Sequence, residues 1–263
     1  MNKTNPDAVT TVDGPAGPIE VREWGSGLSV VMIPSLGRGA SDFDDLAGRL
    51  AVAGYRVLCP EPRGIGGSTG TLAGLTMADL ADDVAAVIED KSEGAVTLVG
   101  HAFGNRVARM TATEHAGLVD RVALLCCGGL VPPAPEIHAA LVKVFDSERS
   151  DAEHLEAVRR AFFAAGNDPT VWADGWHGIV ATAQGAANTG TPASHWWAGG
   201  GRELLVVQPV DDVLAVAENA RQIVDEFGDR AILVLVPEAG HALLPEQPEA
   251  VAKALLDWLG KWK

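Results

Sequence analysis

The chain has 263 residues, 47% of them hydrophobic, which is enough to build one α/β domain around a large core. It carries 35 acidic residues against 20 lysines and arginines, and the resulting net charge of −15 opposes binding to nucleic acid or to an anionic membrane. The longest apolar runs, residues 28–33 and 231–236, are too short to span a bilayer. We therefore expect a globular monomer or homodimer with neither a nucleic-acid nor a membrane partner.

The N-terminus and the cysteines indicate the cellular compartment of the protein. Residues 1–18 are polar and lack a basic segment followed by an apolar one, so we expect no signal peptide. Cys59, Cys126 and Cys127 lie in apolar, strand-like stretches, where a small odd number of cysteines is typical of buried free thiols in a reducing compartment. A Cys126–Cys127 disulfide and a catalytic thiol are the alternatives. These features predict a cytoplasmic protein.

Short apolar runs bounded by glycine or proline predict strands. In chain order they are residues 19–24, 28–33, 55–59, 96–99, 120–126, 203–208 and 231–236. Segments with apolar residues at helical spacing predict helices. These are residues 41–50, 76–90, 106–112, 141–145, 155–163, 214–227 and 248–259. Strands that alternate with helices in this way indicate a doubly wound, mostly parallel sheet.

Three local signals refine these elements. The Gly-Ser-Gly sequence at residues 25–27 indicates a hairpin between the first two strands. Ser41 or Asp42 is expected to cap the first helix, and Thr76 to begin the second. The alternation of strands and helices stops between residues 131 and 202, which are predicted to be helical and hold four of the seven tryptophans.

The strand at residues 96–99 leads into the motif Gly-His-Ala-Phe-Gly at residues 100–104, and helix-compatible residues follow. Glycines on both sides let a backbone close around a strained central residue without Cβ clashes. Strand, tight turn and helix together are the geometry of a nucleophile elbow. The motif resembles the Gly-x-Ser-x-Gly elbow of the α/β-hydrolase superfamily, in its serine hydrolase branch. Ala102 occupies the position of the serine.

The resemblance covers nearly the whole chain. Residues 60–68 are similar to the Asp-x-Arg-Gly-x-Gly-x-Ser loop of the superfamily, with Glu61 in the first place. The resemblance implies an α/β-hydrolase core made of residues 1–130 and 203–263. It also implies that residues 131–202 form a helical cap, or lid, inserted before the last two strands.

In this superfamily the nucleophile is followed along the chain by an acid and then by a histidine. The matching positions here are Ala102, Asp212 and His241. Pro209 stands where the superfamily has glycine, so Asp211 remains an alternative acid, and the aspartate pair can also cap the following helix. His241 follows the last predicted strand in a Gly-His loop, which is the position of the superfamily's catalytic histidine.

The resemblance also implies an oxyanion hole made of backbone N–H groups, those of Phe103 and Leu36. The residues expected to contact substrate are Ser35, Trp172, Trp176 and Trp197. We interpret His101 as a packing residue. The histidines of the cap that could also touch substrate are His138, His177 and His195.

No cofactor or metal is expected. The chain has no His-x-x-x-His or Cys-x-x-Cys spacing and no phosphate-binding loop of the Gly-x-x-x-x-Gly-Lys type. The glycine-rich residues 64–67 lack the spacing and context of a dinucleotide site.

A methyl group cannot attack a carbonyl, so Ala102 removes the nucleophilic step. We interpret the chain as a serine hydrolase for a carboxylic ester or lactone of a small apolar substrate, inactive because alanine replaces serine. One alternative is a non-hydrolytic binder of small molecules. Another is a cofactor-independent lyase or dioxygenase that uses His241 and Asp212 as a base. A further alternative is that the natural protein has a nucleophilic aspartate at position 102.

Overall fold

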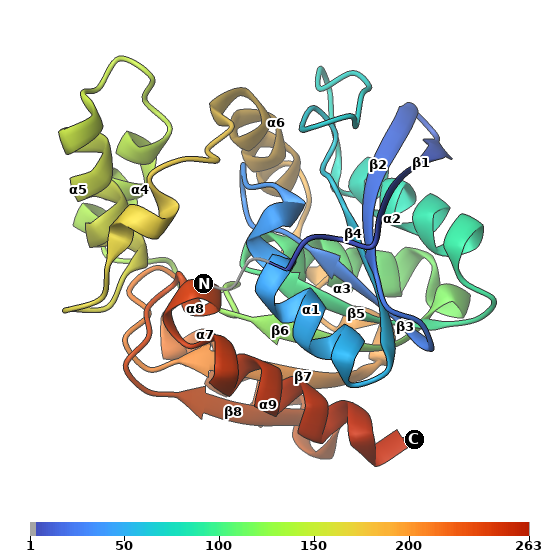
Figure 1. Cartoon of the computed structure of the whole chain (residues 1–263). Helices are drawn as coiled ribbons and strands as arrows, with labels where there is room; N and C mark the ends of the chain where they lie inside the picture. Colours follow the sequence, from blue (N-terminus) through green and yellow to red (C-terminus); the bar gives the residue numbers. More distant parts are fainter. Residues whose placement is uncertain (1–3, 263) are drawn as a thin grey trace.

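The computed structural model describes residues 4–262, and within them eight strands form a single sheet with helices on both faces (Figure 1). The strands are β1 Ala8–Gly14, β2 Gly17–Trp24, β3 Leu28–Ile33, β4 Tyr55–Pro60, β5 Val96–His101, β6 Val119–Leu125, β7 Glu203–Pro209 and β8 Ala231–Val236. The helices are α1 Asp44–Val52, α2 Met77–Lys91, α3 Phe103–Glu114, α4 Pro135–Val144, α5 Asp151–Phe162, α6 Gly178–Thr189, α7 Ala217–Phe227, α8 Leu243–Glu246 and α9 Pro248–Leu259. None of these helices combines the length and apolar character that a membrane crossing needs.

Both faces of the sheet are buried, and neighbouring residues of one strand point to opposite faces. Val31 and Leu204 pack on one face with α2, α3 and α7, whereas Val30 and Leu205 pack on the other with α1 and α9. A strand covered on both faces is expected to be largely apolar, as residues 30–33 of β3 and 204–207 of β7 are. The doubly wound, mostly parallel sheet predicted from the sequence is confirmed.

The predicted hairpin between residues 19–24 and 28–33 is wrong. The sheet order is β1-β2-β4-β3-β5-β6-β7-β8, so β2 pairs antiparallel with β1 and β4, while β3 lies between β4 and β5. Gly25 and Gly27 have positive φ angles of 64° and 114° and carry the chain from β2 to β3. A Cβ atom at Gly27 would lie 2.4 Å from the carbonyl oxygen of Gly54. These glycines therefore make a crossing connection beside β4 instead of a hairpin turn.

Helix α2 begins as predicted, whereas α1 does not. The Thr76 hydroxyl accepts a hydrogen bond from the N–H of Asp79, whose carboxylate accepts one from the N–H of Thr76, and the two form a capping box. Among the described residues, no side chain caps α1 or the 3₁₀ turn before it. Asp42 is engaged elsewhere, because it accepts a hydrogen bond from Nε of Arg38 at 2.8 Å.

The helical insertion lies between β6 and β7, where the sequence predicts it. Helices α4 and α5 pack on each other to one side of the sheet, and α6 lies closer to α3 and α2 (Figure 1). The insertion has a small apolar cluster of its own, which includes Val158, Phe162 and Trp172. Leu214 and Ala242, which follow β7 and β8, join this cluster. The insertion is therefore anchored at the carboxyl ends of the last two strands.

The three cysteines are buried and free, as the sequence predicts. Cys59 lies in β4, and Cys126 and Cys127 follow β6 directly. Burial raises the pKa of each thiol. All three are therefore protonated at neutral pH and behave as small apolar side chains.

Candidate active site

The turn between β5 and α3 has the tight geometry predicted for a nucleophile elbow. Ala102 stands at its centre with φ 50° and ψ −108°, a conformation that few residues other than glycine adopt. A Cβ atom at Gly100 would lie 2.4 Å from the backbone of Asn105, and one at Gly104 would lie 2.1 Å from the carbonyl oxygen of Ile33. Both glycines are therefore required by the close approach of the backbone, and the turn holds Ala102 at the carboxyl end of β5.

His241 follows β8 and Asp212 follows β7, and the structure brings their side chains together. Nδ1 of His241 lies 2.9 Å from Oδ2 and 3.1 Å from Oδ1 of Asp212, and both residues are buried. Oδ1 of Asp212 also accepts hydrogen bonds from the N–H groups of Leu214 and Ala215, which fix the carboxylate. Asp211 is exposed. Asp212 is therefore the carboxylate that orients the His241 ring and leaves its Nε2 for proton exchange.

A second histidine supports His241 through its backbone. His101 is the last residue of β5, and its Nε2 lies 2.9 Å from the carbonyl oxygen of His241. A carbonyl only accepts, so Nε2 of His101 carries the hydrogen. Burial lowers the pKa of His101 to about 3, and the ring stays neutral. His101 packs against the site and exchanges no proton near neutral pH.

The two residues expected to supply the N–H groups of an oxyanion hole line the same cavity as Ala102. Phe103 is the first residue of α3, so its N–H has no partner within the helix, and Leu36 lies in the loop after β3. Within residues 4–262 neither N–H makes a hydrogen bond, which leaves both able to donate to a ligand. The next N–H in that loop, of Gly37, donates to Oε1 of Gln184 at 2.8 Å and ties the loop to α6.

These residues line one cavity of about 310 Å³, here named the Ala102 cavity. Its wall includes Ala102, Phe103, Leu36, His241 and also Ser35, which the sequence predicted as a substrate contact. The volume is within the usual range for small-molecule sites. Five elements or loops that follow different parallel strands contribute to it, as expected for the carboxyl edge of an α/β sheet.

Sequence reasoning missed several side chains of the Ala102 cavity, of which Arg106 and Phe162 matter most for its chemistry. Arg106 projects from α3 one turn after Ala102, and Phe162, at the end of α5, lies against His241 with ring centroids 5.5 Å apart. The spacing of four residues along one helix could have indicated Arg106. Of the three cap histidines named from the sequence, His138 is the one that borders the cavity.

The structure corrects the expectation that three tryptophans contact substrate, because none of them borders the Ala102 cavity. Trp172 and Trp176 pack edge to face against each other, and the guanidinium carbon of Arg38 lies 4.6 and 4.5 Å from their ring centroids. Trp197 packs in the core beside α3, and its Nε1 donates to Glu226 at 2.7 Å. These large rings bury apolar area and hold the insertion in place.

One group of buried side chains has the composition of a metal site. The ligand atoms of Cys126, Asp212 and His241 all lie within 4.8 Å of one another. The Cys126 thiol donates to the carbonyl oxygen of His241 at 3.4 Å, and burial raises its pKa well above the usual range. Metal binding and nucleophilic attack both need a thiolate, and the Asp212 oxygens are already hydrogen-bonded. The protonated thiol is therefore a poor metal ligand and a poor nucleophile. That the chain binds no metal or cofactor stays a prediction.

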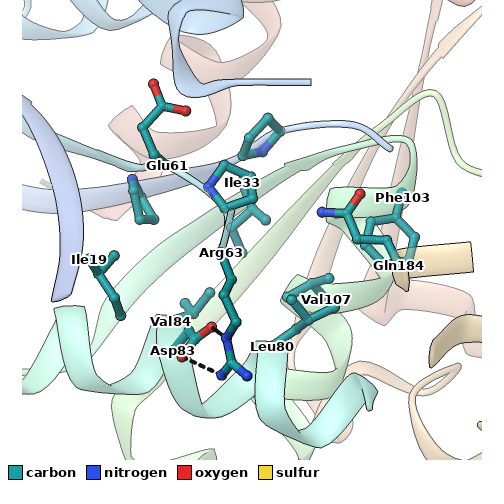
Figure 2. A pocket seen from close by; sticks show the side chains of 13 residues that line it. Ile19, Ile33, Glu61, Arg63, Leu80, Asp83, Val84, Phe103, Val107 and Gln184 are labelled. Carbon is teal, nitrogen blue, oxygen red and sulfur yellow. Dashed lines mark hydrogen bonds and ion pairs between the residues drawn. The ribbon is translucent and has the colours of Figure 1, made fainter. Parts of the chain in front are cut away.

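Phe103 also borders a second, smaller cavity, here named the Arg63 cavity (Figure 2). Its volume of about 40 Å³ has room for water but not for a substrate. Arg63 crosses it and pairs with Asp83 through two hydrogen bonds of 2.8 and 3.0 Å. Beside it, the Glu61 carboxylate accepts a hydrogen bond from the N–H of Ala40 at 2.8 Å, and burial raises the pKa of Glu61.

Sequence comparison finds relatives of this chain among known proteins. A sequence profile of the alpha/beta hydrolase family matches residues 30–254. A non-heme haloperoxidase from Rhodococcus erythropolis is 35% identical over 126 residues, 48% of this chain and 44% of that protein. A putative carbamate hydrolase, RutD, from Variovorax paradoxus is 33% identical over 107 residues, 40% of each protein. These matches cover less than half of the length of either relative.

Solved structures agree on the architecture. An esterase from Exiguobacterium antarcticum superposes with a TM-score of 0.82 over 96% of this chain and 100% of the esterase. The two chains are 19% identical, so the likeness concerns the fold alone.

Proposed function

This chain belongs to the alpha/beta hydrolase family, and from that premise we propose that its Ala102 cavity is the binding site for a carboxylic ester or lactone. We further propose that Ala102 takes the place of a nucleophilic serine, so that the chain binds its substrate without forming an acyl-enzyme. The single observation that carries the proposal is the arrangement of Ala102, in an elbow conformation, with the His241–Asp212 pair around one cavity.

The proposal assigns each group a step. With serine at position 102, the hydroxyl oxygen would attack the ester carbonyl while Nε2 of His241 takes its proton. The N–H groups of Phe103 and Leu36 would donate to the oxygen that becomes negative, and the Asp212 carboxylate would stabilise the imidazolium. His241 would then protonate the leaving alcohol, and a water molecule would hydrolyse the ester formed with the serine by the same steps in reverse order.

The body of the substrate is proposed to be largely apolar. Leu36, Phe162 and Leu141 line the Ala102 cavity, and the insertion that carries two of them would act as a lid over the bound ligand. Closing such a site removes water and strengthens every polar interaction within it.

The decisive experiment is Ala102→Ser, assayed with p-nitrophenyl acetate, p-nitrophenyl butyrate and a panel of lactones. Because loss of the nucleophile lowers turnover by roughly a millionfold in a serine hydrolase, the substitution should produce a gain of several orders of magnitude. Ala102→Gly is the matched control, since it changes the same position without adding a hydroxyl, and it should stay silent.

The alternatives make different predictions for the same variant. If Ala102→Ser is folded and silent on the whole panel, the chain is better described as a small-molecule binder. If the unaltered chain consumes oxygen or splits a ligand without a serine, His241 and Asp212 act as a base in a lyase or dioxygenase reaction. Either result would contradict the hydrolase proposal.

A further inference from the structure

Arg106 is the one lysine or arginine that borders the Ala102 cavity. Its Nη1 donates to Oδ1 of Asn188 at 2.8 Å, and the ring of Trp196 lies 5.5 Å from its guanidinium carbon. Asn188 is neutral, so it satisfies one N–H of Arg106 without balancing its charge. Within residues 4–262 no carboxylate is close enough to form an ion pair with Arg106.

The neighbouring Arg109 shows what a structural arginine on this helix looks like. Arg109 is fully buried and donates to the carbonyl oxygens of Asn105 and Gly128 and to the Asn105 side chain. Its guanidinium also lies over Trp196 at 4.6 Å. Burial lowers its pKa to about 10, so it remains a cation at neutral pH and adds positive charge behind Arg106.

Arg106 is partly exposed, whereas Arg109 is fully buried. The N–H groups of the Arg106 guanidinium that do not face Asn188 make no hydrogen bond within the described chain, and the residue borders the cavity. Burial lowers the pKa of Arg106, which indicates that its surroundings solvate the cation poorly. The other lining residues contribute no Asp or Glu, and Asp212 lies behind His241. A ligand that enters this cavity therefore meets one uncompensated positive charge.

We propose that the substrate of this site carries a carboxylate, and that Arg106 binds this carboxylate while the carbonyl to be attacked lies at Ala102. This rests on the proposed function only in that it places the substrate in the Ala102 cavity. The planar guanidinium fork matches a carboxylate with two parallel hydrogen bonds. Although the chain has a net charge of −15, an isolated cation inside the cavity favours an anionic ligand over a neutral ligand of the same shape.

The position of Arg106 limits the length of the substrate. Ala102 precedes α3, Arg106 lies in the first turn of that helix, and both border the same cavity of about 310 Å³. The carboxylate and the ester carbonyl should therefore be joined by a short chain. Half-esters of small dicarboxylic acids have this form, with the acid at one end and the ester at the other.

The experiment measures binding to the unaltered chain, in which no serine can consume the ester. Monophenyl succinate, monophenyl glutarate and monophenyl adipate are titrated by calorimetry against phenyl pentanoate, in which a methyl group replaces the acid of the glutarate compound. We expect at least one half-ester to bind about tenfold to a hundredfold more tightly than phenyl pentanoate, the range expected of hydrogen bonds to a charged group.

Variants then test whether Arg106 is responsible. Arg106→Gln should abolish the preference for the half-ester and leave the affinity for phenyl pentanoate unchanged, whereas Arg106→Lys should keep part of the preference. Arg221→Gln is the control, because Arg221 is an exposed arginine on α7, away from the cavity, and the substitution removes the same charge. Equal affinity for acid and neutral ligand, persistence of the preference in Arg106→Gln, or no binding of any half-ester would overturn the inference.

The outcome is separable from that of the proposed function. If Ala102→Ser hydrolyses phenyl pentanoate as fast as monophenyl glutarate, the hydrolase proposal holds and the carboxylate inference fails. If Ala102→Ser is silent but half-esters bind in an Arg106-dependent way, the inference holds and the hydrolase proposal fails.

Discussion

Two arginines border cavities that share the ring of Phe103, and they differ in what balances their charge. Arg63 pairs with Asp83 through two hydrogen bonds, and the space around it is about 40 Å³ (Figure 2). Arg106 has the neutral Asn188 as its side-chain partner, and the space beside it is about 310 Å³. The first arginine is completed by the protein itself, whereas the second has N–H groups left for a molecule from outside.

For these two arginines, the difference indicates which cavity combines an unpaired cation with room for a ligand. A buried charge with a partner of opposite sign is a stable part of a core, and removing one member leaves the other uncompensated. A cation without such a partner costs free energy in the folded protein, and a suitable ligand recovers part of that cost. Changes around Arg63 should therefore affect stability, and changes around the Ala102 cavity should affect ligand chemistry.

The largest expected effect is a loss of ester turnover in the Ala102 cavity when His241 is changed. Introduced together with Ala102→Ser, the substitution His241→Gln should lower ester turnover by roughly ten-thousandfold to a millionfold, because the base is lost. Initial rates with p-nitrophenyl butyrate measure this effect. Glutamine can still donate a hydrogen bond to Asp212, so the unfolding free energy should change little. A large loss of stability with a small loss of activity would instead mark His241 as structural.

The next largest expected effect is a loss of folding stability when the Arg63–Asp83 pair is broken. Arg63→Met leaves Asp83 without its partner in a largely buried place and should lower the free energy of unfolding by about 3 kcal/mol. Urea unfolding followed by tryptophan fluorescence measures this change. Affinity for esters in the Ala102 cavity should be unchanged in the folded variant. Weakened binding in Arg63→Met would show that the two cavities are coupled through Phe103.

Lowering the pH should change the free energy of unfolding in opposite directions through His101, which packs against His241, and Glu61, which borders the Arg63 cavity. The pKa of His101 is lowered to about 3 by burial, so the folded chain resists a proton that the unfolded chain accepts below pH 6.5. Stability from this group is complete above pH 6.5 and is lost as the pH falls. The pKa of Glu61 is raised by burial, so the cost of keeping it ionised is relieved as the pH falls.

The measurement is the unfolding free energy at pH 7 and pH 5 in the parent chain and in two variants. His101→Gln should lose roughly 2 kcal/mol less than the parent over this interval, since the proton uptake of one unfolded histidine disappears. Glu61→Gln should lose more than the parent, because a group that favours the folded state in acid has been removed. The same pH dependence in His101→Gln and the parent would mean that His101 is protonated in the folded chain.

The sequence predicts most of the sheet because buried parallel strands leave a simple pattern. Residues 30–33 and 204–207 form unbroken apolar runs, as expected of strands between two layers of helices. The elbow is also local, since Gly100 and Gly104 are required by the turn itself and by the adjacent strand. Strand β1, by contrast, is a largely exposed edge strand with alternating polar residues, so the sequence assigns the hairpin to the wrong pair of strands.

The walls of the Ala102 cavity are harder to predict because they depend on packing between distant segments. The four-residue spacing from Ala102 points to Arg106, but packing with distant segments decides that Arg106 borders a cavity while Arg109 is enclosed by Trp196 and Trp197. Trp197 illustrates the converse error. An aromatic residue in a predicted lid is an attractive substrate contact, but the structure uses its ring as core.

The smallest expected effect tests the comparison most directly. Arg106→Met should change the free energy of unfolding by less than about 1 kcal/mol, because the lost hydrogen bond to Asn188 is offset by the removal of a poorly solvated cation. Urea unfolding at pH 7 without ligand measures the change beside that of Arg63→Met. A loss as large as that of Arg63→Met would show that Arg106 is already balanced within the protein. Near-equality with the parent would show that the protein itself does not balance the Arg106 charge, and the half-ester titrations then test whether a ligand does.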